Sequence, residues 1–469
     1  MSGVGQLAGL RILLLNWRDL SNPAAGGAEA YAEQIARRFV AAGAAVTLFT
    51  ARYPDAPPYE WANGYLVVRR GGRFGVYLAA ARHLRKHRRH YDAVIDFQNG
   101  IPFFAPLFAR ASVPVVCVFH HVHQAQFDLY FRWPGNRVAR LLESRVSRRV
   151  YRDRPLVAVS PSTRAEMRHQ LGIREAIHIV PNGTEPLPPS TVPRSASPAI
   201  AVVTRLVPHK RLHLLVNAVP DLLRRWPELR VDIAGTGPAR DALLAQVREL
   251  GLEHAVKLPG RVSQQVKSDL LSAAWLTVTP SLAEGWGLTV LEANAAGTPA
   301  VAYDVPGLRD SVRDKITGWL APPDTGLAAA LASALDELAD PEQRRRIADQ
   351  CQRWAARFSW DSSAERLAAV LLSEIQRQGQ DGPNRRRPID LATVAWWPPE
   401  DAEEIGKLLR KTLRATDVIS TGADGLSVLL TGCDEVGAMK ALQRVPVPPS
   451  RLRLATTAQV LCGTSDNPW

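Results

Sequence analysis

The sequence predicts an α/β protein made of two successive strand–helix halves and a small α+β domain near its C-terminal end. Short apolar runs of buried-strand length alternate with segments of helical periodicity over residues 1–185. The same alternation restarts after residues 186–198, where proline and serine are frequent, as in a linker. This pattern is typical of parallel sheets covered by helices. We therefore expect two Rossmann-like domains that face each other across a cleft, with ligands at the carboxyl ends of the strands.

The opening strand–loop–helix–strand unit defines the first half. Leu10–Leu15 is an apolar run, and Ala28–Ala41 has helical spacing and ends before Gly43. Val46–Thr50 is the next apolar run, so the unit resembles the building block of a parallel sheet. Further strands of this half are expected at Ala93–Phe97, Val113–Phe119, Leu156–Ser160 and Ala176–Val180.

The second half repeats this organisation after the linker. Its expected strands are Ile200–Thr204, Arg230–Ala234, Ala255–Leu258, Leu276–Thr279 and Ala300–Tyr303. Pro220 falls inside the first helical segment and predicts a kink or a break there. A final helix at about Asp361–Gln378 is expected to strap the halves together.

The C-terminal segment begins after a second linker at Asp381–Pro388. Its expected elements are a strand at Ile389–Trp396, a helix at Glu400–Leu413, a strand at Leu426–Thr431, a short helix at Glu435–Leu442 and a strand at Arg453–Leu461. We therefore predict domains at residues 1–185 and 186–360, a strap helix at 361–380 and a small α+β domain at 389–463.

Composition narrows the class of protein. Hydrophobic residues make up 46% of the 469 residues and charged residues 22%, as in soluble globular proteins. No apolar run reaches the roughly 18 residues of a membrane-spanning helix, and the first apolar run is expected to be a strand, not a signal peptide. The four cysteines form no C-x-x-C pair, which favours neither zinc nor disulfides and suits a reducing cytoplasm.

The net charge of +13 is compatible with anionic partners. Nucleic acid, anionic lipid headgroups and phosphorylated substrates would all be attracted, and a general preference for arginine explains the charge equally well. Because the chain contains no zinc-finger, RNP-like or recognition-helix pattern, we expect no nucleic-acid partner.

The segment EGWGLTVLEANAAGTP, which begins at Glu284, is the most informative part of the chain. Gly285 and Gly287 predict a loop, and Leu288–Ala296 predicts a helix. A glycine-rich loop before a helix presents backbone N–H groups at the positive end of the helix dipole, and this arrangement binds phosphate. Glu284 and Glu292 add carboxylates for hydroxyl groups, so the segment suits a nucleotide sugar.

Two other loops carry groups that suit a diphosphate. GGAEAY, from Gly26, places Gly26 and Gly27 directly before a helix, where the backbone can approach a phosphate closely. TRLVPHKR, from Thr204, places Arg205 and Lys210 after a strand, where two cations can neutralise a diphosphate. The G-x-G-x-x-G pattern is absent, which argues against a nicotinamide enzyme.

A histidine-rich loop, FHHVH, follows another expected strand. His120, His121 and His123 lie there without an obvious carboxylate motif, so a contact with substrate is favoured over a zinc site. A packed histidine that bonds to the backbone is the remaining alternative.

Together with VSPST at Val159 and PNGT at Pro181, these motifs resemble those of retaining glycosyltransferases with the GT-B fold. This large family includes phosphatidylinositol mannosyltransferases, sucrose synthases and glycogen synthases. The resemblance extends from about Gly9 to Arg377 and implies two facing Rossmann-like domains. It also implies that no cofactor and no catalytic metal are needed, and the chain contains no D-x-D motif.

The resemblance assigns roles to individual residues. It implies that Glu284 contacts the donor sugar near the reacting carbon and that His120 lies beside that sugar, as the catalytic residues. The donor-binding residues that it implies are Gly26, Gly27, Arg205, Lys210, Gly287, Leu288, Thr289 and Glu292.

The implied reaction moves a hexose from a nucleoside-diphosphate sugar, of the GDP-mannose or UDP-glucose type, to a lipid, polysaccharide or small glycoside. The alternative is a non-catalytic scaffold that binds sugar nucleotides and interacts with partners through its C-terminal domain.

The segment VYLAAARHLRKHRRH, residues 76–90, is relevant to membrane binding. Tyr77, Leu78 and Leu84 predict an apolar stripe beside basic residues, and such a helix can lie on an anionic bilayer. The same pattern is typical of a solvated helix face. We expect a cytoplasmic protein, with peripheral attachment to the inner face of the plasma membrane left open.

The C-terminal segment from Leu408 resembles the second half of a GGDEF domain, the diguanylate cyclase fold. The signature turn is degenerate, because Gly422–Leu426 reads GADGL, and the upstream metal and nucleotide motifs are missing. The resemblance therefore implies no cyclase activity and a role in binding a partner.

Overall fold

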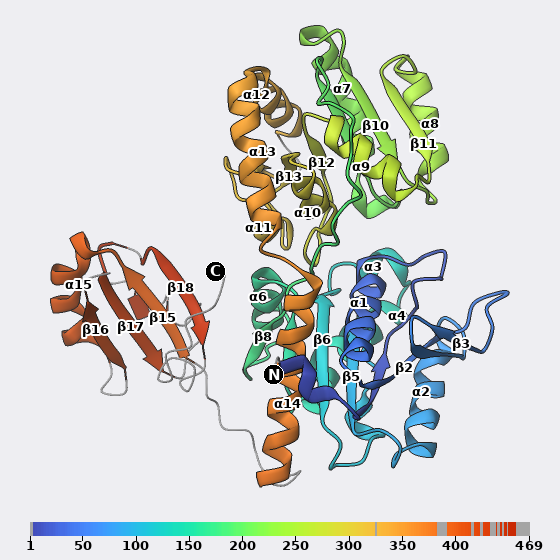
Figure 1. The fold of residues 1–469 in the computed structure, drawn as a ribbon, viewed down its shortest axis with the longest axis vertical. Coiled ribbons are helices and arrows are strands. Elements are labelled where there is room, and N and C mark those ends of the chain that lie inside the picture. Colours follow the sequence, from blue (N-terminus) through green and yellow to red (C-terminus); the bar gives the residue numbers. More distant parts are fainter. Residues whose placement is uncertain are drawn as a thin grey trace. The chain divides into compact units, whose positions relative to one another are not determined.

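The computed structural model describes residues 3–323, 326–381, 392–413, 417–422, 425–431, 438, 441–442, 445–447 and 449–455 (Figure 1). The chain divides into two compact units. The first comprises residues 1–173 and 177–384, and the second comprises residues 174–176 and 385–469. In the described part, no helix is both long enough and apolar enough to cross a membrane.

The first half of the large unit is an eight-stranded sheet in the order β3-β4-β2-β1-β5-β6-β7-β8. All neighbouring pairs are parallel except β3 and β4. The strands are β1 (Arg11–Leu15), β2 (Ala45–Ala51), β3 (Tyr59–Ala62), β4 (Tyr65–Arg70), β5 (Ala93–Asn99), β6 (Val115–His121), β7 (Leu156–Ala158) and β8 (Ile177–Ile179).

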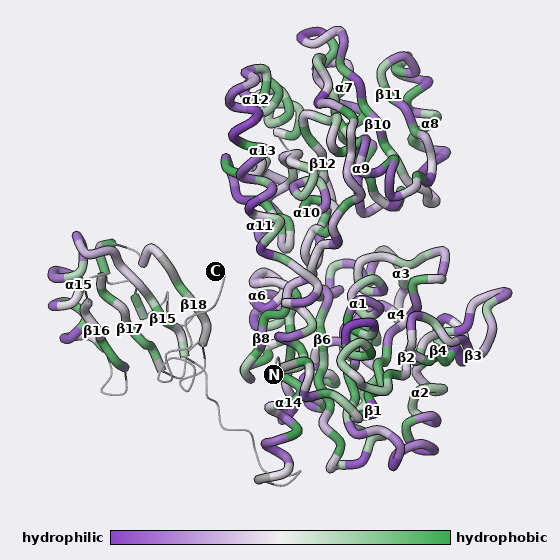
Figure 2. The backbone as a smooth tube through the Cα atoms, viewed as in Figure 1, coloured by the Kyte–Doolittle hydropathy of each residue, from purple (hydrophilic) through white to green (hydrophobic). Residues whose placement is uncertain are grey.

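Both faces of the central strands β1, β5 and β6 are buried, and successive side chains of a strand point to opposite faces. Along β1, Ile12 and Leu14 belong to one core, and Leu13 and Leu15 belong to the other. Figure 2 shows the corresponding hydrophobic colour along central strands such as β6. The helical segments of this half are η1 (Gly3–Leu7), α1 (Gly27–Ala41), α2 (Gly75–Lys86), η2 (Ala105–Leu107), α3 (Phe127–Tyr130), α4 (Gly135–Leu141), the π-helical η3 (Leu142–Val146), α5 (Ser147–Val150) and α6 (Pro161–His169).

The second half contains two parallel sheets of three strands, in the orders β11-β10-β9 and β12-β13-β14. A parallel bridge between Ile200 and Leu276 joins their inner strands. The strands are β9 (Ala199–Val203), β10 (Arg230–Ala234), β11 (Val256–Gly260), β12 (Thr277–Thr279), β13 (Ala300–Tyr303) and β14 (Gly318–Ala321). The helical segments are η4 (Pro208–Lys210), α7 (His213–Arg225), α8 (Arg240–Glu249), α9 (Gln264–Ala273), α10 (Leu288–Ala295), α11 (Leu308–Ser311), α12 (Leu327–Ala339) and α13 (Pro341–Ala355).

Helix α14 (Trp360–Asp381) follows the second half in sequence but packs into a core of the first half. Trp360, Leu367 and Leu371 are buried there beside residues of β1 and α1. The predicted helix is therefore confirmed, and the division of this unit into domains at residue 185 stays a prediction.

The second compact unit contains an antiparallel sheet in the order β16-β17-β15-β18 and one long helix. Its elements are β15 (Ala392–Trp397), α15 (Pro399–Thr412), β16 (Val418–Gly422), β17 (Gly425–Thr431) and β18 (Arg451–Ala455). Trp397, Ile405, Leu409 and Val428 form its core. Residues 423–424, 432–437 and 456–461, on which parts of the GGDEF resemblance, of the short helix and of the last strand fall, lie outside the described residues. That resemblance stays a prediction.

The α/β class and all eleven strands expected in the two halves are confirmed. At Pro220 the sequence predicted a kink or a break. Helix α7 continues through Pro220, so no break occurs, because Val216, Val219 and Leu222 bury its apolar face, while the kink stays a prediction. The predicted apolar stripe of α2 does not face outward. Leu84 is buried and Tyr77 packs against the same core, so only Leu78 of the three is exposed.

Candidate active site

All ten residues predicted for catalysis and donor binding line a single cavity of about 1010 Å³ in the large unit. They come from the end of β6, from the loops that follow β1, β9 and β12, from the start of α1 and from the first two turns of α10. The cavity thus receives side chains from both halves. These residues are Gly26, Gly27, His120, Arg205, Lys210, Glu284, Gly287, Leu288, Thr289 and Glu292.

Glycines 26 and 27 allow the two halves to approach each other closely. A Cβ atom at Gly26 would lie 2.9 Å from Cζ of Arg205, and one at Gly27 would lie 3.1 Å from Cδ1 of Leu288. Arg205 also donates a hydrogen bond from Nη1 to the carbonyl oxygen of Ala24 at 3.0 Å. The start of α1 therefore lies against both Arg205 and the first residue of α10, and these residues line the same cavity.

Lys210 and Glu284 form an ion pair and hydrogen bond at the centre of the lining. Lys210 ends the 3-10 turn η4, and Arg211 after it is held in a left-handed conformation at φ 53°. Burial acts to raise the pKa of Glu284, but the charge and hydrogen bond of the Lys210 ammonium outweigh it, so the pKa is lowered. Glu284 is therefore a carboxylate at neutral pH.

The loop between Glu284 and α10 depends on glycine at two positions. A Cβ atom at Gly285 would lie 2.0 Å from the carbonyl oxygen of His120, so no side chain fits there. Gly287 caps α10 with φ 91°, a left-handed conformation that favours glycine. Further along the helix, Glu292 accepts a hydrogen bond from Nζ of Lys267 at 2.9 Å.

His120 is a neutral, buried imidazole at the end of β6. Its ring lies edge-on to Tyr31, with centroids 5.1 Å apart, and stacks on Phe97 at 5.7 Å. Burial, with a smaller effect of His123, lowers the pKa of His120 to about 3. Its Nε2 atom is buried and has no hydrogen-bond partner in the structure.

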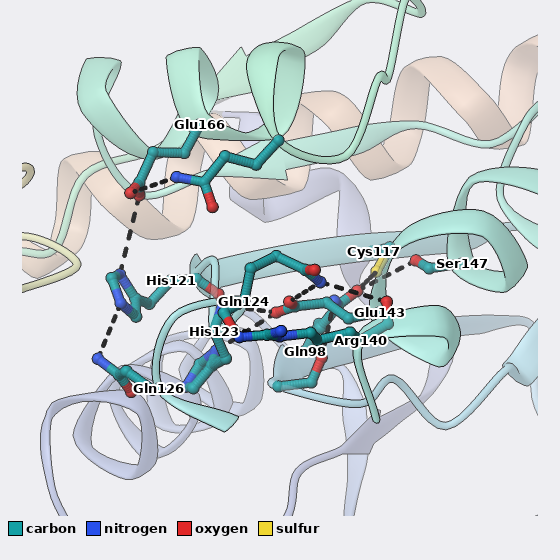
Figure 3. Close-up of polar contacts among 12 residues, drawn as sticks. Gln98, Cys117, His121, His123, Gln124, Gln126, Arg140, Glu143, Ser147 and Glu166 are labelled. Atoms are coloured by element: carbon teal, nitrogen blue, oxygen red, sulfur yellow. Dashed lines mark hydrogen bonds and ion pairs between the residues drawn. The ribbon is translucent and has the colours of Figure 1, made fainter. Parts of the chain in front are cut away.

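The loop after His120 is fixed by a carboxylate that the sequence did not reveal (Figure 3). Glu143 is fully buried in the π-helical turn η3 and accepts hydrogen bonds from the backbone N–H of His123 and from Nε2 of Gln124, each at 2.7 Å. Arg140 adds a hydrogen bond from Nε to the carbonyl oxygen of Gln124 at 2.9 Å. These contacts define the path of the loop that brings His121, His123 and other residues to the cavity.

On the other side of this loop, His121 faces Glu166 of α6 (Figure 3). Nδ1 of His121 lies 3.9 Å from Oε2 of Glu166, and Nε2 lies 3.0 Å from the amide nitrogen of Gln126. Burial raises the pKa of Glu166 to about 7, against the opposing hydrogen bond from Gln170. In the described part of the chain, no group of three or more histidine, cysteine and acidic residues is arranged to hold a metal ion.

Glu29, which lies in the cavity wall, is a second buried carboxylate that sequence reasoning missed. It accepts a hydrogen bond from the backbone N–H of Gly26 at 2.7 Å and one from Nε of Arg18 at 3.1 Å. The bond to Gly26 is the reciprocal half of a capping box, so the G-x-x-E spacing before α1 was a usable signal. For Glu143 no local signal exists, because its partners lie 19 and 20 residues away.

Two protein-family models match the large unit. The model for glycosyl transferases group 1 matches residues 185–354, and the model for glycosyltransferase family 4 matches residues 25–186. The chain is 31% identical to the glycogen synthase of Mycobacterium tuberculosis over 290 residues, which is 61% of this chain and 69% of that protein. It is also 31% identical to a D-inositol 3-phosphate glycosyltransferase of Kineococcus radiotolerans over 405 residues, covering 75% of this chain and 91% of that protein.

Solved structures share the fold at lower identity. Sucrose-phosphate synthase from Thermosynechococcus elongatus is 21% identical, with a TM-score of 0.65 over 79% of this chain and 98% of that one. The Anabaena protein HepE, in complex with UDP and glucose, is 19% identical, with a TM-score of 0.59 over 78% of this chain and 100% of that one. The family models, the relatives and the fold agree, and the chain belongs to the group 1 glycosyltransferases, with the GT-B fold.

Proposed function

We propose that this glycosyltransferase moves a hexose from a nucleoside-diphosphate sugar to a lipid, polysaccharide or small glycoside, with retention of the anomeric configuration and without a catalytic metal. The observation that carries the proposal is the Lys210–Glu284 pair, which lies in one cavity with Arg205 and with the first turns of two helices. This arrangement places positive groups and one carboxylate around a space large enough for a sugar nucleotide.

The diphosphate of the donor is assigned to the positive groups. Arg205 and Lys210 neutralise its charge, and the backbone N–H groups of Leu288 and Thr289 point at it from the start of α10. The structural relative HepE, which was solved in complex with UDP-glucose, supports this class of donor. Preorganised charge of this kind stabilises the leaving group in the transition state.

The sugar is assigned to Glu284 and His120. The bond between the anomeric carbon and the diphosphate oxygen breaks first, and the carboxylate of Glu284 stabilises the positive charge that develops on the sugar. The acceptor oxygen then bonds to the anomeric carbon on the same face, and a departing diphosphate oxygen takes the acceptor proton. Because Glu284 is ionised, it supplies charge and no proton, and the neutral His120 holds a sugar hydroxyl group.

The proposal is tested by the change Glu284→Gln, which keeps the shape of the side chain and removes its charge. We expect kcat to fall by about 100-fold or more, while binding of the nucleoside diphosphate persists. Transfer is measured with a panel of sugar nucleotides, and NMR of the product's anomeric proton reports the configuration. Undiminished turnover by the variant contradicts the role of Glu284, and an inverted product contradicts retention.

We also propose that the enzyme binds anionic membranes peripherally through the basic residues of α2 and the turn after it. The support is their exposure together with Leu78 beside them, although the apolar stripe is smaller than the sequence predicted. The exposed basic residues are Arg82, Arg85, Lys86, Arg88 and Arg89. Flotation with phosphatidylserine vesicles at low salt tests the proposal, and absence of the protein from the floating fraction contradicts it.

A further inference from the structure

The side chains that line the cavity carry more positive than negative charge. Each of its three carboxylates has its own cation: Glu284 pairs with Lys210, Glu29 with Arg18 at 3.1 Å, and Glu292 with Lys267 at 2.9 Å. The lining cations that remain without an ion pair among the described residues are Arg52, Arg73 and Arg205. The proposed function uses Arg205, together with Lys210, for the donor diphosphate, so the guanidinium groups of Arg52 and Arg73 remain without a counter-charge.

These two arginines lie on the wall formed by the first half. Arg52 directly follows β2, and Arg73 follows β4 by three residues. Because β4, β2 and β1 are neighbours in the sheet and parallel, their carboxyl ends lie side by side. Both arginines are exposed, and α2 has no acidic residue in its first turn. Of the carboxylates that line the cavity, Glu29 is the one contributed by the first half, and Arg18 and Gly26 already occupy it.

Trp17 contacts the segments that follow β1, β2 and β4 and so connects them. Its indole Nε1 donates to the carbonyl oxygen of Arg73 at 2.9 Å, and its own carbonyl oxygen accepts from the backbone N–H of Ala51 at 3.1 Å. The guanidinium of Arg18 lies 4.3 Å from the centroid of the Trp17 ring. The positions of Arg18, Arg52 and Arg73 are thus linked through one aromatic residue, and the loops that carry them are held relative to one another.

Aromatic side chains complete this wall. Tyr53, Phe74, Tyr77 and Phe131 line the cavity together with Trp17. The rings of Phe74 and Phe131 lie 6.1 Å apart. Aromatic faces suit the apolar face of a sugar or polyol ring, and a guanidinium fork suits a phosphate. A phosphate monoester carries a charge of roughly −1.5 to −2 at pH 7, which matches two unbalanced guanidinium groups.

We propose that this wall is an acceptor subsite, and that it selects a hydroxylated acceptor that carries a phosphate group held by Arg52 and Arg73. The inference rests on the proposed function. If the donor diphosphate occupies the part of the cavity around Arg205, the wall around Arg52 and Arg73 is left for the acceptor. The phosphate belongs either to a soluble sugar phosphate or to a phospholipid headgroup, and both present the same group to the arginines.

The first step of the test identifies the donor nucleotide by thermal stabilisation with UDP, GDP and their sugars. With that nucleoside diphosphate at saturation, so that the Arg205 side is occupied, calorimetry compares glucose 6-phosphate with glucose. We expect glucose 6-phosphate to bind more tightly by about tenfold or more. The double variant R52A/R73A is expected to lose that difference and to keep the nucleotide-induced thermal shift.

Arg110→Ala is the matched control, because Arg110 is an exposed arginine of the first half that does not line the cavity and is not one of the proposed membrane-binding residues. It should leave the affinity for glucose 6-phosphate unchanged. Because the basic residues of α2 are proposed to bind any anionic vesicle, phosphatidylserine vesicles are the reference for phosphatidylinositol vesicles. Equal binding of glucose and glucose 6-phosphate overturns the phosphate subsite if phosphatidylinositol vesicles also bind no better than phosphatidylserine vesicles. Preferential binding of glucose 6-phosphate over glucose, or of phosphatidylinositol over phosphatidylserine vesicles, that survives R52A/R73A overturns it too.

The vesicle comparison distinguishes the two sources of the phosphate. Loss of binding in R52A/R73A for the soluble probe assigns a sugar phosphate, and loss for phosphatidylinositol vesicles alone assigns a lipid headgroup; both outcomes support the subsite. If no sugar nucleotide stabilises the protein in the first step, the proposed function fails, and this inference falls with it. If a nucleotide stabilises the protein and neither probe depends on the arginines, the inference fails alone.

Discussion

His120 shows how burial fixes the protonation state of one residue in this site. Its imidazole is enclosed by Tyr31 and Phe97, and its pKa falls from an ordinary 6.5 to about 3. Below pH 6.5 the unfolded chain binds a proton that the folded His120 rejects. The stability that this group contributes is therefore present at neutral pH and is lost as the pH falls from 6.5 toward 3.

The change His120→Phe tests whether His120 causes this pH dependence of folding stability. Phenylalanine keeps an aromatic ring at this position and cannot titrate. Between pH 7.5 and pH 5 the wild-type protein should lose about 2 kcal/mol more unfolding free energy than the variant, from linkage at this single site. Urea unfolding at the two pH values measures the difference. Other groups, such as Glu166 with its raised pKa, act equally in both proteins, so identical pH dependence contradicts the neutral assignment.

At the scale of loops and helices, Gly285 controls how closely the two halves meet. Any Cβ atom there would lie 2.0 Å from the carbonyl oxygen of His120, and that oxygen belongs to backbone that cannot rotate away. Gly285→Ala should therefore displace the loop that carries Glu284 and lower kcat/KM by about 100-fold. Gly72→Ala is the matched control, because a Cβ atom at Gly72 has no neighbour within 4 Å. Steady-state kinetics measure kcat/KM of both variants, and equal values for Gly285→Ala and Gly72→Ala contradict the role of Gly285.

The π-helical turn η3 positions Glu143, whose carboxylate holds the loop that contains His123. Glu143→Ala leaves the backbone N–H of His123 without its acceptor, which costs about 1–3 kcal/mol in a buried site. We expect kcat/KM to fall by about tenfold, with unchanged binding of the nucleoside diphosphate, because the loop touches the sugar side of the cavity. Glu143→Gln retains an oxygen acceptor and should recover part of the activity. A purely structural role would instead lower the unfolding free energy of both variants without changing kinetics at low temperature.

Local patterns predicted most of the elements, because buried parallel strands are short apolar runs between loops. The hairpin of β3 and β4 was missed, although Asn63 and Gly64 at its turn have the positive φ angles, 48° and 84°, that this dipeptide favours. At Pro220 the sequence predicted a kink or a break, and no break occurs, because packing of α7 outweighs the local cost of proline. Long-range partners such as Glu143 and His123 leave no periodic trace in sequence, so the supports of the site had to come from the structure.

At the scale of the whole molecule, the two compact units have separate hydrophobic cores. The three largest clusters use residues of the large unit only, and the cluster around Trp397 and Ile405 uses residues of the second unit only. Every residue that lines the cavity belongs to the large unit. The large unit therefore contains both a complete interior and the complete lining of the candidate active site.

A chain that ends at residue 384 should consequently fold and catalyse transfer. The reason is that it keeps α14, whose Leu367 and Leu371 complete a core of the first half, and loses no residue of the cavity. Thermal unfolding and turnover of this fragment measure the two properties against the full chain. A chain that ends at residue 359, which lacks α14, is the contrasting variant and should aggregate, because it exposes that core. If the 384-residue fragment folds but transfers no sugar, the second unit takes part in the reaction, and the independence of the two units is wrong.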